Sequence, residues 1–153
     1  MRVLTVGMRM PEWVNRGVEE YAKRMPRDAA IEWCEIPASK RVRDTAQSRM
    51  LEECQAIEKR LKVQESIIVL DVEGKMVSTA SIADAMASWQ SEAVKAAFVI
   101  GGPDGVHPQL KARATAQWSL GRITLPHPLV RVILAEQLYR AWSINAGHPY
   151  HRA

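Results

Sequence analysis

The sequence predicts an α/β fold in which a mostly parallel β-sheet is flanked by helices. Short apolar runs alternate along the chain with longer stretches whose apolar residues recur at helical spacing. Two of these runs, SIIVLD and KAAFVI, are almost continuously apolar, which is typical of parallel strands buried on both faces. The 153 residues, 47% of them hydrophobic and 25% charged, suit one globular domain. We therefore expect residues 1–153 to form a single domain.

The expected strands are short segments bounded by residues typical of turns. The first two are RVLTVG and IEWCEI, which end at a glycine and just before a proline. The third and fourth are the two apolar runs, and the fifth is WSLGRITL, which ends before Pro126. The five expected strands cover residues 2–7, 31–36, 66–71, 95–100 and 118–125.

A helix is expected after each strand. Pro11 and Pro108 suit the first turns of the first and fourth helices, and Pro26 ends the first. Asp44, with Gln47 three residues later, resembles a capping box at the start of the second helix. The third and fifth helices follow from the apolar spacing alone. The five expected helices cover residues 11–25, 44–61, 81–89, 108–116 and 128–146.

Residues suited to chemistry gather in the last third of the chain. All four histidines lie beyond residue 106. Basic side chains outnumber acidic ones from residue 101 onward, whereas the charges cancel up to residue 100, so the net charge of +4 belongs to the same region. A basic face suits a polyanion such as RNA. The alternative interpretation is an ordinary solvated surface.

Several classes of protein are not indicated. No window approaches the roughly 18 apolar residues of a membrane span, and the first residues lack the apolar core of a signal peptide, so we expect a cytoplasmic protein. Cys34 and Cys54 form neither a zinc signature nor a disulfide framework and are expected to be buried, inert thiols. No metal site is predicted.

Three segments are expected to meet in one pocket, because ligands bind beyond the carboxyl ends of parallel strands. They are residues 70–71, 101–102 and 125–126. Glycines in IGGPDG allow a ligand to approach the backbone, and the prolines on both sides of His127 place it at a helix start. Neither the dinucleotide nor the P-loop fingerprint is met. The alternatives are a tight turn for IGGPDG, a helix N-cap for His127 and a frayed end for the tail GHPYHRA.

The segments IGGPDG, WSLGRITLPHPLVRVILAEQLYRAWSI and HPYHRA closely resemble the ribosomal large subunit methyltransferase H family of the SPOUT superfamily. VGMRMPEWV, EEYAKRMPRD and EIPASKR extend the resemblance over essentially the whole chain. It implies transfer of a methyl group from S-adenosylmethionine to N3 of a pseudouridine in a 23S rRNA stem-loop. It also implies a C-terminal trefoil knot, which rules of chain topology would argue against.

The resemblance implies that the cofactor contacts a strand end, the glycine loop and the segment after the fifth strand. The implied cofactor-binding residues are Leu70, Gly102, Gly121, Arg122, Ile123, Thr124, Leu125 and Pro126. Gly121 and Arg122 are the weaker side-chain contacts, because backbone contacts would tolerate other residues there.

The chemistry needs a proton acceptor, because the N3–H of pseudouridine is a weak acid and its anion is the nucleophile. A sulfonium methyl group is already activated, so the reaction mainly requires positioning and no metal. Among the histidines, His151 is the first candidate for the base, and bulk water is the alternative. Arg152 suits a carbonyl or phosphate, and Tyr150 suits stacking on a base. The candidate catalytic residues are His127, Tyr150, His151 and Arg152.

The resemblance also implies a homodimer in which the tail of one subunit completes the site of the other. The last predicted helix carries more apolar residues than are needed to pack one of its faces on the core. This fits a dimer or, alternatively, a fully buried helix. The expected partner is 23S rRNA within the large subunit or the whole ribosome, recognised by shape because no separate RNA-binding module is evident. The rival functions are a non-catalytic RNA-binding module and a SPOUT methyltransferase acting on another nucleotide or on tRNA.

Overall fold

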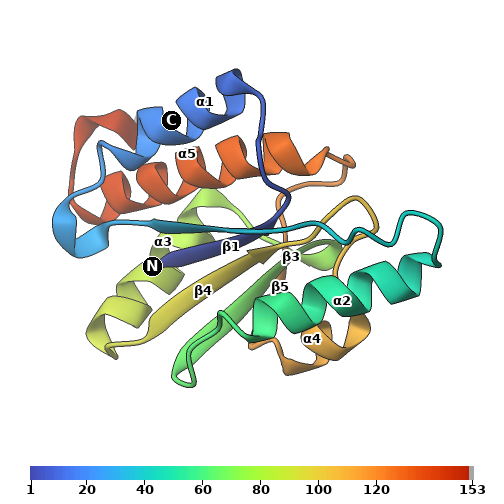
Figure 1. The fold of residues 1–153 in the computed structure, drawn as a ribbon. Coiled ribbons are helices and arrows are strands. Elements are labelled where there is room, and N and C mark those ends of the chain that lie inside the picture. The colour runs from blue at the N-terminus through green and yellow to red at the C-terminus, as the bar shows by residue number, and fades with distance from the viewer. Residues whose placement is uncertain (152–153) are drawn as a thin grey trace.

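The computed structural model describes residues 1–151, which form a five-stranded sheet with helices on both faces (Figure 1). The strands lie side by side in the order β2-β1-β4-β3-β5, and every pairing is parallel. The predicted mostly parallel α/β sheet is therefore confirmed. The strands are β1 (Arg2–Val6), β2 (Glu32–Ile36), β3 (Glu65–Met76), β4 (Lys95–Ile100) and β5 (Ala116–Ser119).

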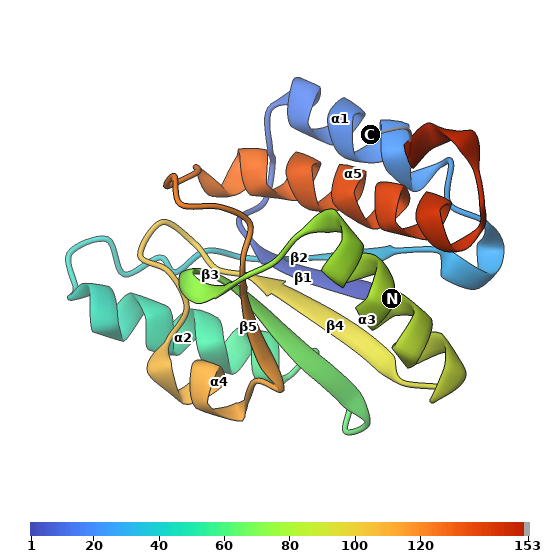
Figure 2. The same cartoon turned by 180° about the vertical axis from the view of Figure 1, so that it is seen from behind.

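The helices divide between the two faces of the sheet (Figure 2). One face is covered by α1 (Glu12–Ala22), α3 (Thr79–Ser91) and α5 (His127–Asn145). The other face is covered by α2 (Ala46–Glu58) and α4 (Pro108–Arg113). Two short 3-10 turns, η1 (Arg27–Ala29) and η2 (Pro149–His151), complete the elements.

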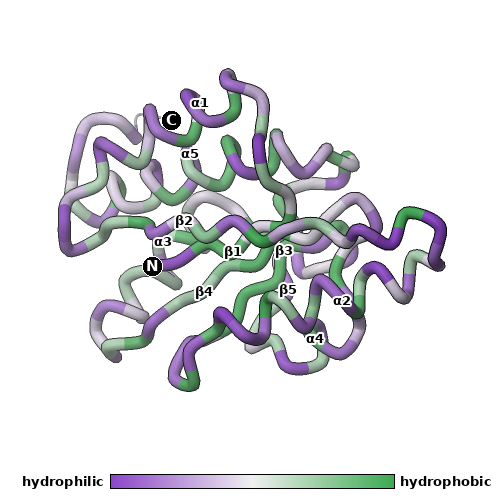
Figure 3. Tube along the Cα trace, in the orientation of Figure 1, coloured by the Kyte–Doolittle hydropathy of each residue, from purple (hydrophilic) through white to green (hydrophobic). Residues whose placement is uncertain are grey.

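Each face of the sheet has its own hydrophobic core, and Figure 3 shows the apolar residues concentrated along the strands between the helices. Phe98 and Trp118 pack with Trp89 on the face of α3 and α5, with ring centroids 5.7 to 5.9 Å apart. On the other face, Cys54 and Leu110 are buried against aliphatic strand residues. No helix within residues 1–151 is both long and apolar enough to cross a membrane.

The prediction of a strand over residues 118–125 was wrong. The strand β5 begins earlier and ends at Ser119, because Ser119 Oγ donates a hydrogen bond to the carbonyl of Gly121 and turns the chain. Since Ala116 already pairs with Ile68 in the sheet, α4 must also stop at Arg113, before the predicted residue 116. Residues 120–126 consequently form an irregular loop.

Two further differences from the prediction concern the end of β3 and the start of α2. The strand β3 continues past residue 71 to Met76, with an irregularity between Leu70 and Lys75 that lets both flanking parts pair with β5. The predicted capping box at Asp44 was wrong, because Thr45 is the N-cap of α2 and its side chain accepts from the Ser48 amide. The Asp44 carboxylate instead pairs with Arg41.

Candidate functional site

A cavity of about 820 Å³ opens at the carboxyl edge of the sheet. Three segments line it: residues 70–72 after the buried part of β3, residues 100–106 between β4 and α4, and parts of 118–130 between β5 and α5. These segments include residues 70–71, 101–102 and 125–126, so the prediction that they meet in one pocket is confirmed. The volume is within the range of ligand sites.

The residues predicted to bind a cofactor gather at this cavity, with one exception. Those that line it are Leu70, Gly102, Gly121, Ile123, Thr124, Leu125 and Pro126. Arg122 is exposed and is not part of the lining. This agrees with the expectation that the backbone of Arg122 matters more than its side chain.

The glycine loop, residues 101–105, depends on its glycines for its shape. Gly105 has φ of +91°, and its amide donates to the carbonyl of Gly102 at 3.0 Å, so the tight-turn interpretation is also correct. A methyl group placed on Gly101 would lie 2.6 Å from the carbonyl oxygen of Gly105. The close approach of Gly101 to Gly105 therefore requires glycine at position 101.

The loop 120–126 offers unpaired backbone amides. Within residues 1–151, the N–H groups of Ile123, Thr124 and Leu125 have no hydrogen-bond partner. Ile123 and Thr124 are exposed and Leu125 is half-buried, so these amides are free to donate to a ligand bound in the cavity. Together with the apolar walls formed by Leu70 and Trp118, they fit a ligand with a flat apolar body and polar edges. The adenosine part of S-adenosylmethionine has this character.

Both carboxylates that line the cavity are paired with cations from outside it. Asp71 pairs with Lys111 of α4, and Asp104 forms a bidentate pair with Arg49 of α2 at 2.7 and 2.9 Å. The hydrogen bonds from Arg49 lower the pKa of Asp104. Within residues 1–151, no group of three or more metal-ligating side chains could hold a metal ion.

His127 is the first residue of α5 and lines the cavity. The N-cap position belongs to Pro126 and no side chain caps the helix, so the N-cap interpretation of His127 was wrong. Burial and then the charge of Arg131 lower the pKa of His127, which keeps the imidazole neutral at neutral pH. A neutral imidazole can accept a proton.

Arg131 fixes the start of α5 against the end of β1. It is only 3% exposed, and its Nη2 donates to the carbonyls of Val6 and Gly7 at 3.0 and 2.7 Å. Its Nη1 donates to Glu35 at 2.9 Å. Because a buried guanidinium needs such partners, this network anchors the helix turn that carries His127.

The tail lies at the opposite end of α5. Tyr150 packs on Tyr139 with ring centroids 4.7 Å apart, and its hydroxyl donates to Glu136 at 3.2 Å. Burial, followed by hydrogen bonding to Tyr21, raises the pKa of Tyr150 to about 12. His151 contacts the carbonyl of His148 through Nδ1. Because η2 packs on α5, the tail is not frayed within the described residues, which end at 151.

The structure does not bring the tail and the cavity of one chain together. α5 has 19 residues, which at roughly 1.5 Å per residue separates its ends by about 28 Å. His127 lies at one end, whereas Tyr150 and His151 pack near the other. Arg152 lies outside the described residues.

The sequence interpretation missed the polar residues that support the site. Arg131 and Glu53 are both buried, and each interrupts a helix face that is otherwise apolar. A charge within an apolar stripe was the available signal for both. Arg49 and Lys111 had no comparable signal, because their partners come from distant parts of the sequence.

The chain is similar to known methyltransferases over its whole length. A family model described as "Predicted SPOUT methyltransferase" matches residues 1–151. Three curated relatives carry the name "Ribosomal RNA large subunit methyltransferase H". The one from Chromohalobacter salexigens is 49% identical, with 99% of each chain covered. Those from Hahella chejuensis and a Marinomonas species are 45% and 44% identical, covering 99% of this chain and 98% and 99% of theirs.

Proposed function

The chain belongs to the SPOUT methyltransferase family, and from this we propose that it methylates N3 of a pseudouridine in 23S rRNA, using S-adenosylmethionine. The observation that carries the proposal is the cavity at the carboxyl edge of the sheet, which collects all but one of the residues expected to bind the cofactor. The printed names of the relatives support large-subunit rRNA as the substrate.

The residues that would hold the cofactor are those of the glycine loop, the loop 120–126 and the strand end at Leu70. The free amides of Ile123, Thr124 and Leu125 would bind polar edges, and Gly102 would allow close approach of the backbone. When bound, S-adenosylmethionine supplies a methyl group on a positively charged sulfur, which is activated for direct transfer. The chain itself then has to orient the nucleophile and accept a proton.

We propose His127 as the proton acceptor, in place of His151. His127 lines the cavity, is neutral at neutral pH and is held by the turn that Arg131 anchors. It would take the proton from N3 as the nitrogen becomes nucleophilic. The basic Arg131 also disfavours the protonated imidazolium, so His127 would release the proton to solvent after transfer.

We propose that the tail acts on a second subunit. Tyr150, His151 and Arg152 would complete the cavity of the partner in a homodimer, because in one chain the described part of the tail lies at the far end of α5. Tyr150 would then stack on the base, and Arg152 would bind a carbonyl or phosphate. The trefoil knot and the action of residues 1–153 as one domain stay predictions from the family, as does a cytoplasmic location beside ribosomes.

The test uses ribosomes from cells that lack the protein. They are incubated with the purified chain and S-adenosylmethionine, with free rRNA in parallel, and the nucleosides are identified by mass spectrometry. We expect N3-methylpseudouridine to form with ribosomes and not with free rRNA. If the chain binds the cofactor but no such nucleoside forms, the substrate assignment is wrong and tRNA is the next pool to examine. Failure to bind the cofactor would instead favour a non-catalytic RNA-binding module.

A further inference from the structure

Glu53 is a buried carboxylate between two functional loops. It belongs to α2 and is 5% exposed. Its Oε1 accepts from the amide of Ser39 at 2.9 Å, whereas Oε2 has no hydrogen-bond partner within residues 1–151. A methyl group placed on Gly102 would lie 3.0 Å from Oε2 and 3.3 Å from Oε1, so the carboxyl group packs directly against this glycine. Glu53 therefore contacts the glycine loop on one side and Ser39 on the other.

Ser39 belongs to the basic loop, residues 37–45, which joins β2 to α2 and carries Lys40, Arg41 and Arg43 on its exposed surface. This loop starts at the carboxyl end of β2, the same edge of the sheet at which the cavity opens. Figures 1 and 2 both show it at the end of the molecule where the turn after β4 and the start of α5 also lie. A ligand large enough to span this edge would contact both loops.

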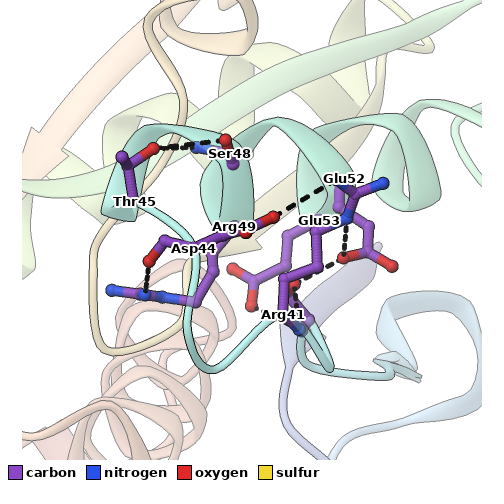
Figure 4. Close-up of polar contacts among 8 residues, drawn as sticks. Arg41, Asp44, Thr45, Ser48, Arg49, Glu52 and Glu53 are labelled. Atoms are coloured by element: carbon purple, nitrogen blue, oxygen red, sulfur yellow. Dashed lines mark hydrogen bonds and ion pairs between the residues drawn. The ribbon is translucent and has the colours of Figure 1, made fainter.

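The first half of α2 contacts both the basic loop and the glycine loop, and Figure 4 shows its contacts with the basic loop. Arg49 donates to the carbonyl of Asp44 in the basic loop and to the carboxylate of Asp104 in the glycine loop. Glu52, in contrast, makes its side-chain polar contacts within residues 1–151 with the basic loop, through the Ser39 hydroxyl and Arg41. Neighbouring residues of one helix thus differ in whether they connect to the cavity.

The charges of the basic loop favour phosphate as its ligand. Lys40 and Arg43 form no ion pair within the described part of the chain, which leaves both cations available. Exposed cations on a connecting loop suit the backbone of rRNA, whose affinity comes mainly from phosphate neutralisation. This step rests on the proposed function, which supplies rRNA as the partner.

We propose that Glu53 is a positioning residue that couples the two loops, so that cofactor binding at the glycine loop and contact of the basic loop with rRNA phosphates strengthen one another. A ligand that fixes Gly102 also fixes the carboxyl group packed against it, and the hydrogen bond to Ser39 passes this restraint to the basic loop. Because buried groups are closely packed, neither loop can shift without displacing Glu53. Coupling of this kind is reciprocal between the two ligands.

The experiment measures the affinity of the chain for unmodified ribosomes with and without saturating S-adenosylhomocysteine, which occupies the cofactor site without reacting. In the unsubstituted protein, we expect the cofactor product to tighten ribosome binding by about fivefold or more. In Glu53→Ala this gain should fall below about twofold. Glu53→Gln should restore it, because the amide keeps the volume and an oxygen that can accept from Ser39.

Glu52→Ala is the matched control, because Glu52 holds the basic loop without reaching the glycine loop. In Glu52→Ala the affinity for ribosomes should fall, because the basic loop loses a contact, whereas the gain caused by S-adenosylhomocysteine should stay at its full value. Ser39→Pro provides a second test outside the helix, since it removes the amide that Glu53 accepts from, together with the hydroxyl that contacts Glu52, and it should abolish the gain. Glu52→Ala controls for the loss of the hydroxyl contact. It applies even if Glu53→Ala does not fold, which thermal unfolding would show.

Two results would overturn the coupling. One is that the unsubstituted protein binds S-adenosylhomocysteine but binds ribosomes no more tightly in its presence. The other is a full gain in folded Glu53→Ala or Ser39→Pro. If the unsubstituted protein does not bind S-adenosylhomocysteine at all, the proposed function fails as well, so the two failures are distinguished by the binding of the cofactor product alone.

Discussion

The two ends of α5 differ in how completely their polar groups are satisfied. At the N-terminal end, His127 borders a cavity, and the preceding loop leaves the amides of Ile123 to Leu125 without partners in the described chain. At the C-terminal end, the rings of Tyr139, Trp142 and Tyr150 contact one another, and the Tyr150 hydroxyl is bonded to Glu136. The first end is built to receive a ligand, and the second is closed by its own contacts.

This difference bears on how the tail can take part in catalysis. Tyr150 contacts Glu136 and Tyr139, which lie nine and twelve residues beyond His127, so roughly 14 to 18 Å along α5 keep Tyr150 apart from His127 in its own chain. The family resemblance nevertheless implies that the tail belongs to the site. We therefore expect the tail to serve the cavity of a second subunit. The following predictions test each end of α5 and then their proposed combination.

Gly102→Val should have the largest effect on the cavity. The first added carbon would lie 3.0 Å from Glu53 and 3.1 Å from Val6, so the glycine loop would have to shift from its place in the cavity wall. We expect cofactor affinity to fall by roughly 100-fold, or about 2.8 kcal/mol, in a titration calorimetry experiment. Overpacking should also lower the free energy of unfolding by about 1 to 3 kcal/mol.

Gly121→Ala is the control for this change, because an added methyl group at Gly121 has no neighbour within 4 Å and no positive φ is needed there. Its free energy of unfolding should match that of the unsubstituted protein, which makes it a control for the overpacking expected in Gly102→Val. Normal cofactor binding by folded Gly102→Val would mean that the glycine loop does not contact the cofactor.

Arg152→Ala should abolish methyl transfer while leaving cofactor affinity nearly unchanged, since the proposed role of Arg152 is toward the RNA. If the tail of one subunit completes the cavity of the other, a mixture of two inactive variants should regain activity. If Arg152→Ala and Gly102→Val subunits exchange, a mixed dimer contains one site with an intact cavity and an intact tail. An equal mixture should then recover about one quarter of the normal activity per site, given random pairing in a two-fold dimer.

The measurement is methyl transfer to ribosomes after the two variants are mixed and allowed to exchange. Each variant alone is the control and should be inactive. A mixture as inactive as its components, although sedimentation shows exchanged dimers, would contradict the shared site. A monomer at micromolar concentration would contradict the dimer itself.

His127→Gln should lower the rate of transfer by about 100-fold, the lower range for loss of a general base. The pH dependence identifies the reason. Burial and Arg131 lower the folded pKa of His127 below 6.5, so activity should fall as the pH drops through that lowered value. Below about 6.5 the unfolded chain binds a proton that the folded chain does not, so stability also falls with decreasing pH.

In His127→Gln, the acidic limb of the activity profile and this contribution to the pH dependence of stability should both disappear. Denaturant unfolding at pH 5 and pH 8 measures the second effect independently of activity. If water is the proton acceptor instead, the activity profile of His127→Gln will keep its acidic limb.

The sequence was sufficient to predict the sheet and most helices, because short apolar runs and helical periodicity are local signals. It failed where tertiary contacts set the boundary. The segment 120–126 contains strand-forming residues, yet the hydrogen bonds between Ser119 and Gly121 end β5 before it. The strand order could not be read from local patterns, because it depends on which strands pair across the sheet.

The candidate site was predictable only in part, for a related reason. Glycine allows backbone conformations that other residues avoid and proline fixes φ, so the loops that line the cavity were visible in the sequence. Arg49, Lys111 and Glu53 act through partners that are distant in the sequence, and only the fold reveals these pairs. The location of the tail relative to His127 likewise depends on the packing of η2 on α5.

Tyr150→Phe should have the smallest effect and tests the closed end of α5. The ring contact with Tyr139 is kept and the contacts of the hydroxyl with Glu136 and Tyr21 are lost, so the free energy of unfolding should fall by about 1 kcal/mol. Because the pKa of Tyr150 is raised to about 12, the unfolded chain loses this proton near pH 10 before the folded chain does, and stability should decrease as pH rises above about 10. Tyr150→Phe should lack that decrease, whereas Tyr150→Ala should cost more at every pH because it also removes the ring contact. Equal stability of the Phe and Ala variants in denaturant unfolding would show that the tail does not pack on α5 in solution, and the contrast between the two ends of the helix would then be lost.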